Sequence, residues 1–359
     1  VHMEEWYNRN GGYSRYSSMY SSVIDKTLVC NENSKKILES HFNRINNEVE
    51  TVYIGVDEEK FNPNKYDAVE LKKKYLGSEN NKKILSFICR ISEQKRPMLL
   101  LKIISKLKEL RQDFQVLVVG DGNLLNRMKE EAQKQNLINE IVFLGKIQNT
   151  AEIYEISDLT INCSLKEGLA LTAYESLSMG VPVISSDVGG QKELITEKTG
   201  EIIELMQDEK DIYNEQYKEE EIKEYVNAIN KVLNNLQEYK KNCRKRICKY
   251  FTIDKMIDKM DKIFEEVHKN PNKEKILNGK NLSSNINITK ELITANLKND
   301  EEEYEWECME YEKKIYGKPY SKQGFNAKKE LLKEKLWNIQ IWRSAIKMYH
   351  KILKKERKK

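Results

Sequence analysis

The sequence predicts an α/β fold built on a parallel sheet that carries helices on both faces. Short runs of β-branched and apolar residues alternate with longer helical segments between residues 84 and 184. Alternation at this spacing is typical of a parallel sheet. The strand runs lack a clean exchange of polar and apolar positions, which favours burial on both faces.

Strands and helices are expected to alternate along this region. The strands are Ile84–Ile88, Gln115–Val119, Glu140–Leu144, Leu159–Cys163 and Val181–Ile184, and the helices are Pro97–Leu110, Leu124–Gln135, Thr150–Ile156 and Leu169–Met179. Ligands of such sheets bind outside the carboxyl ends of the strands. Arg90, Gly120, Lys146 and Glu167 all lie at or just after these ends, so a ligand site is predicted along one edge of the sheet.

Further elements are expected on either side of this region. Asp25–Cys30 reads as a strand, and a capped helix follows from Asn33. Gln207–Glu221 is highly charged and predicts a loop, after which helical segments continue to about residue 235. Ile253–Val267 has the periodicity of an amphipathic helix.

Composition limits the class of protein. The 359 residues are enough for two compact units with extensions, and a net charge of +5 does not indicate a nucleic-acid binder. The six cysteines show neither a Cys-x-x-Cys pair nor a Cys/His metal spacing, so we expect no metal or cofactor and a reducing, cytoplasmic setting. No apolar run approaches the ~20 residues of a spanning helix, and no secretory signal is visible.

The most informative stretch runs from Glu167 to Glu175, where two carboxylates stand eight positions apart. The first lies in a loop with Gly168, and the second lies inside the helix that follows. The start of such a helix offers unpaired backbone N–H groups that suit a phosphate. This corner could therefore hold a sugar, a diphosphate and a ribose, which are the parts of a sugar nucleotide.

Motifs in order along roughly residues 50–267 resemble the donor-binding half of the family 4 glycosyltransferases of GT-B fold. The landmarks are Gly55-Val56-Asp57, Arg90 with Lys95, Gly120-Asp121-Gly122, Gly145, Ser157-Asp158, the pair Glu167 and Glu175, and Asp187-Val-Gly-Gly190 with Glu193. The resemblance implies a Rossmann-like parallel sheet domain that binds a nucleoside diphosphate sugar.

The resemblance implies that Arg90 and Lys95 are catalytic cations. It also implies that His2 and Glu167 are catalytic residues beside the reaction centre. Two cations near a departing diphosphate stabilise the charge that develops there. No Asp-x-Asp occurs in the sequence, which argues against the metal-dependent alternative fold. Cys89 stands where the family usually has glycine before Arg90. The bland alternative is a solvated arginine and lysine at a helix start.

The resemblance assigns Glu175 to the ribose hydroxyls and the loop between the two carboxylates to the sugar and phosphate. The expected substrate-binding residues there are Gly168, Leu169, Ala170, Leu171, Thr172 and Glu175. The family often has glycine at the position of Ala170. A glycosidase pair of carboxylates would have to flank a scissile bond at a defined separation, which a helical Glu175 does not suggest.

Two further corners are expected to contact the donor. Gly120, Asp121 and Gly122 follow one strand and open a helix, and the glycines allow a tight turn with close backbone approach. Lys146 and Ile147 would lie against the base. Gly180-Val-Pro182 and the Asp187–Gly190 turn are expected to fix turns rather than to perform chemistry.

The resemblance implies an incomplete N-terminal Rossmann-like domain and predicts the domain boundaries. Residues 1–55 are expected to be the remnant of an acceptor-side domain, 56–267 the donor-binding domain, 268–287 a linker and 288–359 a helical basic extension. His2 would end a missing strand beside the reaction centre, and a frayed terminus is its bland alternative.

The C-terminal extension carries an apolar stripe at helical spacing among many lysines. The stripe comprises Leu332, Leu336, Ile339, Trp342, Ile346, Tyr349 and Leu353. A basic amphipathic helix of this kind can lie on an anionic membrane surface through residues 328–359, which would suit a peripheral enzyme at the inner face of the membrane. Packing on the core or on a partner is the alternative, and it is favoured for Leu332–Trp342, whereas membrane contact suits the lysine-rich end.

The leading hypothesis is a retaining, metal-independent glycosyltransferase of class EC 2.4 that moves a sugar from a nucleoside diphosphate sugar to a glycan or lipid-linked acceptor in cell-envelope polysaccharide assembly. A non-catalytic nucleotide-sugar-binding or scaffold chain that docks through its C-terminal helices is the alternative. A GT-B phosphorylase is a third class, although nothing suggests its cofactor lysine.

Overall fold

A computed structural model describes residues 21–42, 44, 46–77, 81–208 and 212–275 of the chain. All of them belong to one compact unit. Its centre is a sheet of six strands that are parallel throughout. The strands are β3 (Lys83–Ile88), β4 (Phe114–Val119), β5 (Ile141–Gly145), β6 (Leu159–Asn162), β7 (Val183–Ser186) and β8 (Gly200–Ile203).

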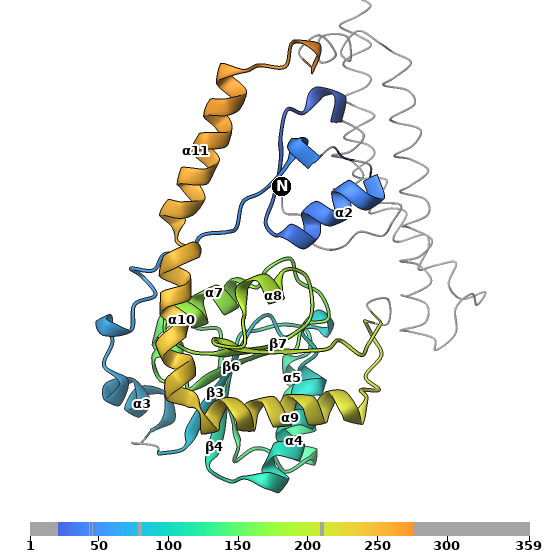
Figure 1. Cartoon of the computed structure of the whole chain (residues 1–359). Coiled ribbons are helices and arrows are strands. Elements are labelled where there is room, and N and C mark those ends of the chain that lie inside the picture. Colours follow the sequence, from blue (N-terminus) through green and yellow to red (C-terminus); the bar gives the residue numbers. More distant parts are fainter. Residues whose placement is uncertain (1–20, 43, 45, 78–80, 209–211, 276–359) are drawn as a thin grey trace, which may run out of the picture. The chain divides into compact units, whose positions relative to one another are not determined.

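Helices cover both faces of this sheet (Figure 1). Those that follow the strands are α4 (Pro97–Leu110), α5 (Leu125–Lys134), α6 (Ala151–Glu155), α7 (Leu171–Ser178), α8 (Gln191–Leu194), α9 (Glu219–Asn234) and α10 (Leu236–Tyr250), and α3 (Ala68–Leu76) precedes them. Helix α11 (Ile253–Lys269) follows α10 and leads away from the sheet. Short 3-10 turns lie at Ser21–Val23, Asn46–Glu48, Pro63–Lys65 and Glu93–Lys95. The expected α/β class with a parallel sheet is confirmed.

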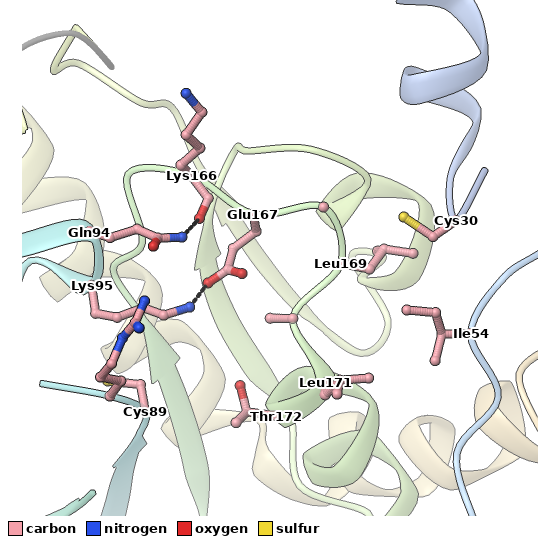
Figure 2. Close-up of a pocket in the computed structure, with 13 residues that line it drawn as sticks. Cys30, Ile54, Cys89, Gln94, Lys95, Lys166, Glu167, Leu169, Leu171 and Thr172 are labelled. Atoms are coloured by element: carbon pink, nitrogen blue, oxygen red, sulfur yellow. Dashed lines mark hydrogen bonds and ion pairs between the residues drawn. The ribbon is translucent and has the colours of Figure 1, made fainter. Parts of the chain in front are cut away.

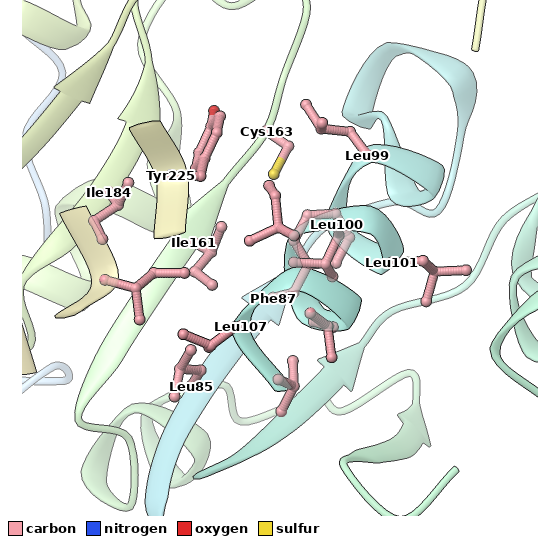
Figure 3. Packing of buried hydrophobic residues seen from close by; sticks show 14 of the residues in the cluster. Leu85, Phe87, Leu99, Leu100, Leu101, Leu107, Ile161, Cys163, Ile184 and Tyr225 are labelled. Atoms are coloured by element: carbon pink, nitrogen blue, oxygen red, sulfur yellow. The ribbon is translucent and has the colours of Figure 1, made fainter. Parts of the chain in front are cut away.

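The sheet is apolar on both faces because successive residues of its strands enter different cores. Leu85 and Phe87 of β3 pack with α4, α5 and α9, as Figure 3 shows around Leu100 and Tyr225. Ile84 and Ile88 of the same strand point into a second core with α6, α7 and α10. This two-sided burial explains the continuous apolar runs of the sequence.

The strand order β5-β4-β3-β6-β7-β8 places the start of the sheet at its centre. From β3 the chain runs outward through β4 to β5, then returns to the other side of β3 and runs outward again. The order therefore reverses between β3 and β6. The crevice outside the carboxyl ends of these two strands is where open α/β sheets bind ligands.

The front segment contributes a small parallel pair, β1 (Thr27–Val29) and β2 (Val49–Thr51), linked by α2 (Glu32–Phe42). Val29, Leu38 and Val49 form its apolar cluster. The expected helix is present, and its cap lies two residues earlier than Asn33. Asn31 accepts the backbone N–H of Ser34 through its side-chain oxygen at 2.6 Å.

The chain enters and leaves the sheet region at adjacent points. Val56 pairs with Thr252 in a parallel bridge, with the N–H of Val56 bonded to the carbonyl of Phe251 at 2.9 Å. Gly55 lies against this crossing, because a Cβ there would approach the Cα of Ile253 to 2.5 Å. The helix α11 begins immediately beyond it.

The observed bounds follow the expected ones with local differences. The helix expected from Leu169 begins at Leu171, so Leu169 and Ala170 belong to the preceding loop. The fifth expected strand runs from Val183 to Ser186 rather than from Val181. Strand β8 and helix α8 were not predicted. No helix among the described residues is long and apolar enough to cross a membrane. The predicted domain boundaries stay a prediction.

Candidate functional site

A cavity of about 320 Å³ lies at the reversal of strand order. It is lined by residues that follow β3, residues that follow β6, and two residues of the front segment. They are Cys30, Ile54, Cys89, Arg90, Gln94, Lys95, Lys166, Glu167, Gly168, Leu169, Ala170, Leu171 and Thr172. The volume falls in the range of small-molecule sites, which run from about 300 to 1,000 Å³.

Two loops face one another across this cavity. The first is the 3-10 turn Glu93–Lys95, which we call the Lys95 turn, and the second is Cys163–Ala170, which we call the Glu167 loop. The N–H of Leu165 donates to the carbonyl of Gln94 at 2.8 Å, and the side-chain amide of Gln94 donates to the carbonyl of Lys166 at 2.8 Å. These bonds join the two loops next to the ion pair of Lys95 and Glu167.

Lys95 and Glu167 form an ion pair between the two loops, and Figure 2 shows their side chains pointing toward one another. Ser164 donates its hydroxyl to the same Oε1 of Glu167 at 2.6 Å. Both contacts fall on Oε1, so this oxygen of the carboxylate is fixed in place. An ammonium group has three N–H donors, so Lys95 keeps two for another ligand.

Arg90 follows β3 and is exposed at the rim of the cavity. Among the residues that the structure describes, it makes no ion pair and no side-chain hydrogen bond. Its guanidinium is thus available for an anion, which it can grip through two parallel N–H donors. Arg90 and Lys95 together make this side of the cavity cationic.

The first turn of α7 closes the cavity on the Glu167 loop side. Ala170 has an extended backbone and no side chain caps the helix start. The N–H groups of Leu171 and Thr172, two residues that line the cavity, therefore lack a side-chain cap, and the positive end of the helix dipole adds to the nearby cations. The predicted residues Gly168 to Thr172 all line the cavity.

The turn at Gly189 and Gly190 supports the Glu167 loop from behind. Gly189 has φ 59°, and a Cβ there would lie 2.1 Å from the carbonyl oxygen of Glu167. The N–H of Gly190 donates to the carbonyl of Gly168 at 2.9 Å. The side-chain amide of Asn31 donates to that same carbonyl at 3.0 Å. As expected, this turn supports the backbone.

Glu175 lies outside the residues that line this cavity. It is held by Thr150 and Tyr154, whose hydroxyls donate to its Oε2 at 3.2 and 3.1 Å. Burial raises the pKa of Glu175, and the two hydrogen bonds oppose that rise. The carboxylate of Glu175 is thus a desolvated hydrogen-bond acceptor. It lies one helical turn beyond the residues of α7 that line the cavity.

The Gly120-Asp121-Gly122 turn braces the loop that carries Arg90. A Cβ on Gly120 would lie 1.8 Å from the carbonyl oxygen of Cys89, and one on Gly122 would lie 2.2 Å from that of Ile91. The N–H of Ile91 donates to the carbonyl of Asp121 at 2.9 Å. In the structure, these glycines therefore allow a close approach to the backbone of Cys89 and Ile91.

Lys146 is exposed and Ile147 is half-buried, and neither lines the cavity. Their contact with a base, like the donor contacts of the glycine turn, stays a prediction. His2 and the stretch 328–359 lie outside the described residues. Among those that the structure describes, no group of three or more His, Cys, Asp and Glu side chains could hold a metal ion.

Sequence reasoning missed five lining residues. Gln94 and Lys166 are neighbours of predicted residues, and the strand-end position of Cys89 was a usable signal. Cys30 ends the expected strand Asp25–Cys30 and Ile54 directly precedes the Gly55-Val56-Asp57 motif, but neither was assigned to the site. Burial raises the pKa of the Cys89 thiol, which keeps it protonated at neutral pH.

Comparison with known proteins adds independent evidence. The family model of glycosyl transferases group 1 matches residues 69–249. The chain is 30% identical over 264 residues, covering 70% of itself and 62% of the relative, to the UDP-Gal:alpha-D-GlcNAc-diphosphoundecaprenol alpha-1,3-galactosyltransferase of Escherichia coli. It is 35% identical over 161 residues, covering 44% of itself and 41% of the relative, to the putative glycosyltransferase EpsF of Bacillus subtilis.

The fold is also similar to a solved glycosyltransferase from Rickettsia africae. The TM-score is 0.62 at 22% identity, with 74% of this chain and 69% of the other covered. This likeness confirms the expected GT-B type of fold class. The chain spans 41 to 62% of the lengths of the two curated relatives above. Because the family model covers half of its length, the chain belongs to the glycosyl transferases group 1 family.

Proposed function

We propose that this chain binds a nucleoside diphosphate sugar and transfers the sugar, with retention of anomeric configuration, to a glycan or lipid-linked acceptor in cell-envelope polysaccharide assembly. The observation that carries the proposal is the cluster of Arg90, Lys95 and Glu167 around a cavity at the reversal of strand order. The Escherichia coli relative is named for a UDP-sugar donor and a lipid diphosphate acceptor, which agrees with this chemistry.

The chemistry assigns charge stabilisation to the two cations. As the bond between the anomeric carbon and the β-phosphate oxygen breaks, negative charge grows on the diphosphate. Arg90 grips phosphate oxygens in a fork, and Lys95 directs its remaining N–H donors to the same group. The departing phosphate oxygen takes the proton of the acceptor hydroxyl as the new glycosidic bond forms on the same face.

Glu167 and Glu175 divide the rest of the donor between them in this proposal. Glu167 orients Lys95 and lies near the donor sugar, while the N–H groups at the start of α7 approach the phosphates. Glu175 accepts the ribose hydroxyls from its desolvated position. His2 is proposed to lie beside the reaction centre, as the resemblance implies.

Thermal unfolding with UDP, GDP, ADP, CDP and dTDP tests the donor site. A nucleotide at 100 times its dissociation constant adds about 2.7 kcal/mol to the free energy of unfolding. One member of the panel should raise the melting temperature of the unmodified protein, and Arg90→Ala should abolish the rise. Arg127→Ala is the matched control, since Arg127 is exposed and pairs with Glu215 away from the cavity. A panel without any stabilising nucleotide would contradict the proposal.

A further inference from the structure

Arg96 lies directly after Lys95 and is almost fully buried, with 1% of its side chain exposed. Its backbone has φ 48° and ψ 54°, in the left-handed region that favours glycine. It ends the Lys95 turn and also caps the start of α4, where its carbonyl accepts the N–H of Leu99 at 3.0 Å. A charged side chain at such a position is unfavourable for solvation, and its Cβ is unfavourable for the left-handed backbone.

The guanidinium of Arg96 spans three elements. Its Nε donates to the carbonyl of Cys163 at 2.5 Å, at the first residue of the Glu167 loop. Its Nη1 lies 2.8 Å from the carboxylate of Glu221, in the first turn of α9. The planar fork fixes the direction of these two contacts relative to each other.

These contacts continue the bonds that join the two loops. Arg96 reaches Cys163, Gln94 reaches Leu165 and Lys166, and Lys95 reaches Glu167. The Lys95 turn is therefore bonded to the Glu167 loop at several points, from the buried guanidinium of Arg96 to the ion pair at the cavity. Arg96 makes the deepest of these connections.

Glu221 is also buried, with 1% of its side chain exposed. Its ion-pair partner among the described residues is Arg96. Buried ion pairs are weak sources of stability, because desolvation offsets the attraction and an apolar pair of similar volume often serves as well. A contribution to stability alone thus does not explain why a buried ion pair involves a residue with a left-handed backbone.

We propose that Arg96 is a positioning residue, which rests on the proposed function: its guanidinium, neutralised by Glu221, holds the Lys95 turn on the carbonyl of Cys163 and so fixes where Lys95 and Glu167 meet at the diphosphate. Arg96 touches no donor atom in this account. It acts through the backbone of the two loops, and its loss displaces Lys95 without removing it.

The double variant Arg96→Met with Glu221→Leu tests this role, because it removes both buried charges at once. Lys108→Met with Glu140→Leu is the matched control, since it removes a partly buried ion pair of 3.0 Å in the same sheet domain, away from the cavity. Affinity for the stabilising nucleoside diphosphate is measured by titration calorimetry. We expect the double variant to bind about tenfold or more weakly, because a displaced Lys95 loses its charge-assisted hydrogen bond to the diphosphate.

Hydrogen exchange of residues 163–170 provides a readout that needs no nucleotide. The N–H of Leu165, bonded to Gln94, should exchange faster in the double variant than in the unmodified protein and in the control. Unchanged exchange and unchanged affinity would overturn the positioning role. If the unmodified protein binds no nucleotide, the proposed function fails, and the exchange result alone decides the role of Arg96.

Arg96→Lys serves if the double variant does not fold. It keeps a positive charge beside Glu221 but loses the planar fork, so the substituted ammonium group cannot hold the carboxylate and the carbonyl of Cys163 in the same geometry. Faster exchange in residues 163–170 with a retained fold supports the proposal. Wild-type exchange in this variant would show that charge alone is sufficient and would refute the geometric role.

Discussion

Two carboxylates eight positions apart occupy opposite electrostatic settings. Glu167 shares an ion pair with Lys95 and accepts from Ser164, so its charge is matched. Glu175 has hydroxyl donors, Thr150 and Tyr154, and makes no ion pair among the described residues. Burial therefore dominates and raises the pKa of Glu175. A nearby hydroxyl pair of a ligand would relieve that desolvation through further hydrogen bonds.

The setting of Glu175 predicts opposite effects of Glu175→Gln on stability and on binding. A raised pKa means that the folded protein binds more protons than the unfolded chain, so the free energy of unfolding falls as pH rises through this carboxyl's titration. The neutral glutamine should make the protein more stable at pH 8 than the original, with the advantage fading toward pH 4. Nucleotide affinity should fall about tenfold or more, since a hydrogen bond to a charged group contributes about 1.5–3 kcal/mol.

Urea denaturation at a series of pH values and titration calorimetry measure these two effects. Glu152→Gln is the control of opposite sign, because hydrogen bonds from Lys74 and Tyr75 lower the pKa of Glu152. Its ionised form stabilises the fold near neutral pH, and this contribution is lost as pH falls through its folded pKa. A Glu175→Gln protein that is less stable at pH 8 than the original would contradict the desolvation argument.

At the scale of elements, the connection from β7 to α8 sets the shape of the Glu167 loop. Gly189 has a left-handed backbone and no room for a Cβ beside the carbonyl of Glu167. Gly190 is restricted by space alone, since a Cβ there would lie 2.5 Å from the Cβ of Asn31. The turn after β7 and Asn31 of the front segment therefore both contact the Glu167 loop, which follows β6.

Gly189→Ala should destabilise the fold and weaken nucleotide binding together. The left-handed backbone and the overpacked contact are expected to lower the free energy of unfolding by about 2–5 kcal/mol. Gly77→Ala is the matched control, because Gly77 has φ 75° and open space around its Cβ position. It should cost about 1 kcal/mol and leave nucleotide affinity unchanged. Equal affinities in the two variants would argue against a supporting role for the turn.

The elements that could be predicted are those whose burial is visible in local sequence. In β3 and in β4, five of the six residues are buried, so their apolar runs stand out. β8 has four residues, begins with Gly200 and alternates only partly in burial, which leaves little signal. Within the site, charged residues at strand ends were visible. Cys30 and Ile54 were not, because their proximity depends on how the front segment packs rather than on local sequence.

At the scale of the molecule, Glu193 links the front segment to the sheet domain. Its two carboxylate oxygens accept the backbone N–H groups of Glu32 and Asn33 at 2.8 and 3.0 Å. Tyr53 donates its hydroxyl to the same carboxylate at 2.8 Å. A side chain on α8 thus caps the first turn of α2, far away in sequence, and holds Cys30 and Asn31 beside the Glu167 loop.

Glu193→Ala should release the start of α2 from the sheet domain. Loss of a helix cap is expected to cost about 1–2 kcal/mol, and hydrogen exchange should accelerate in residues 32–40. Asp67→Ala removes the cap of α3, which accepts from Val69 and Glu70, and is the matched control. Its effect should stay within α3. Faster exchange in residues 32–40 of the control, or none in Glu193→Ala, would refute the link.

The pairing of Val56 with Thr252 has a consequence for how proteins of this kind diversify. Everything between these residues, from the 3-10 turn Pro63–Lys65 to α10, leaves from and returns to one point of the chain. Replacing such a cassette by another of different specificity would leave the path of the remaining polypeptide unaltered, since domain insertion is tolerated where the two ends lie close together. The crossing thus makes the sheet domain a unit that could be exchanged without rerouting the polypeptide on either side of it.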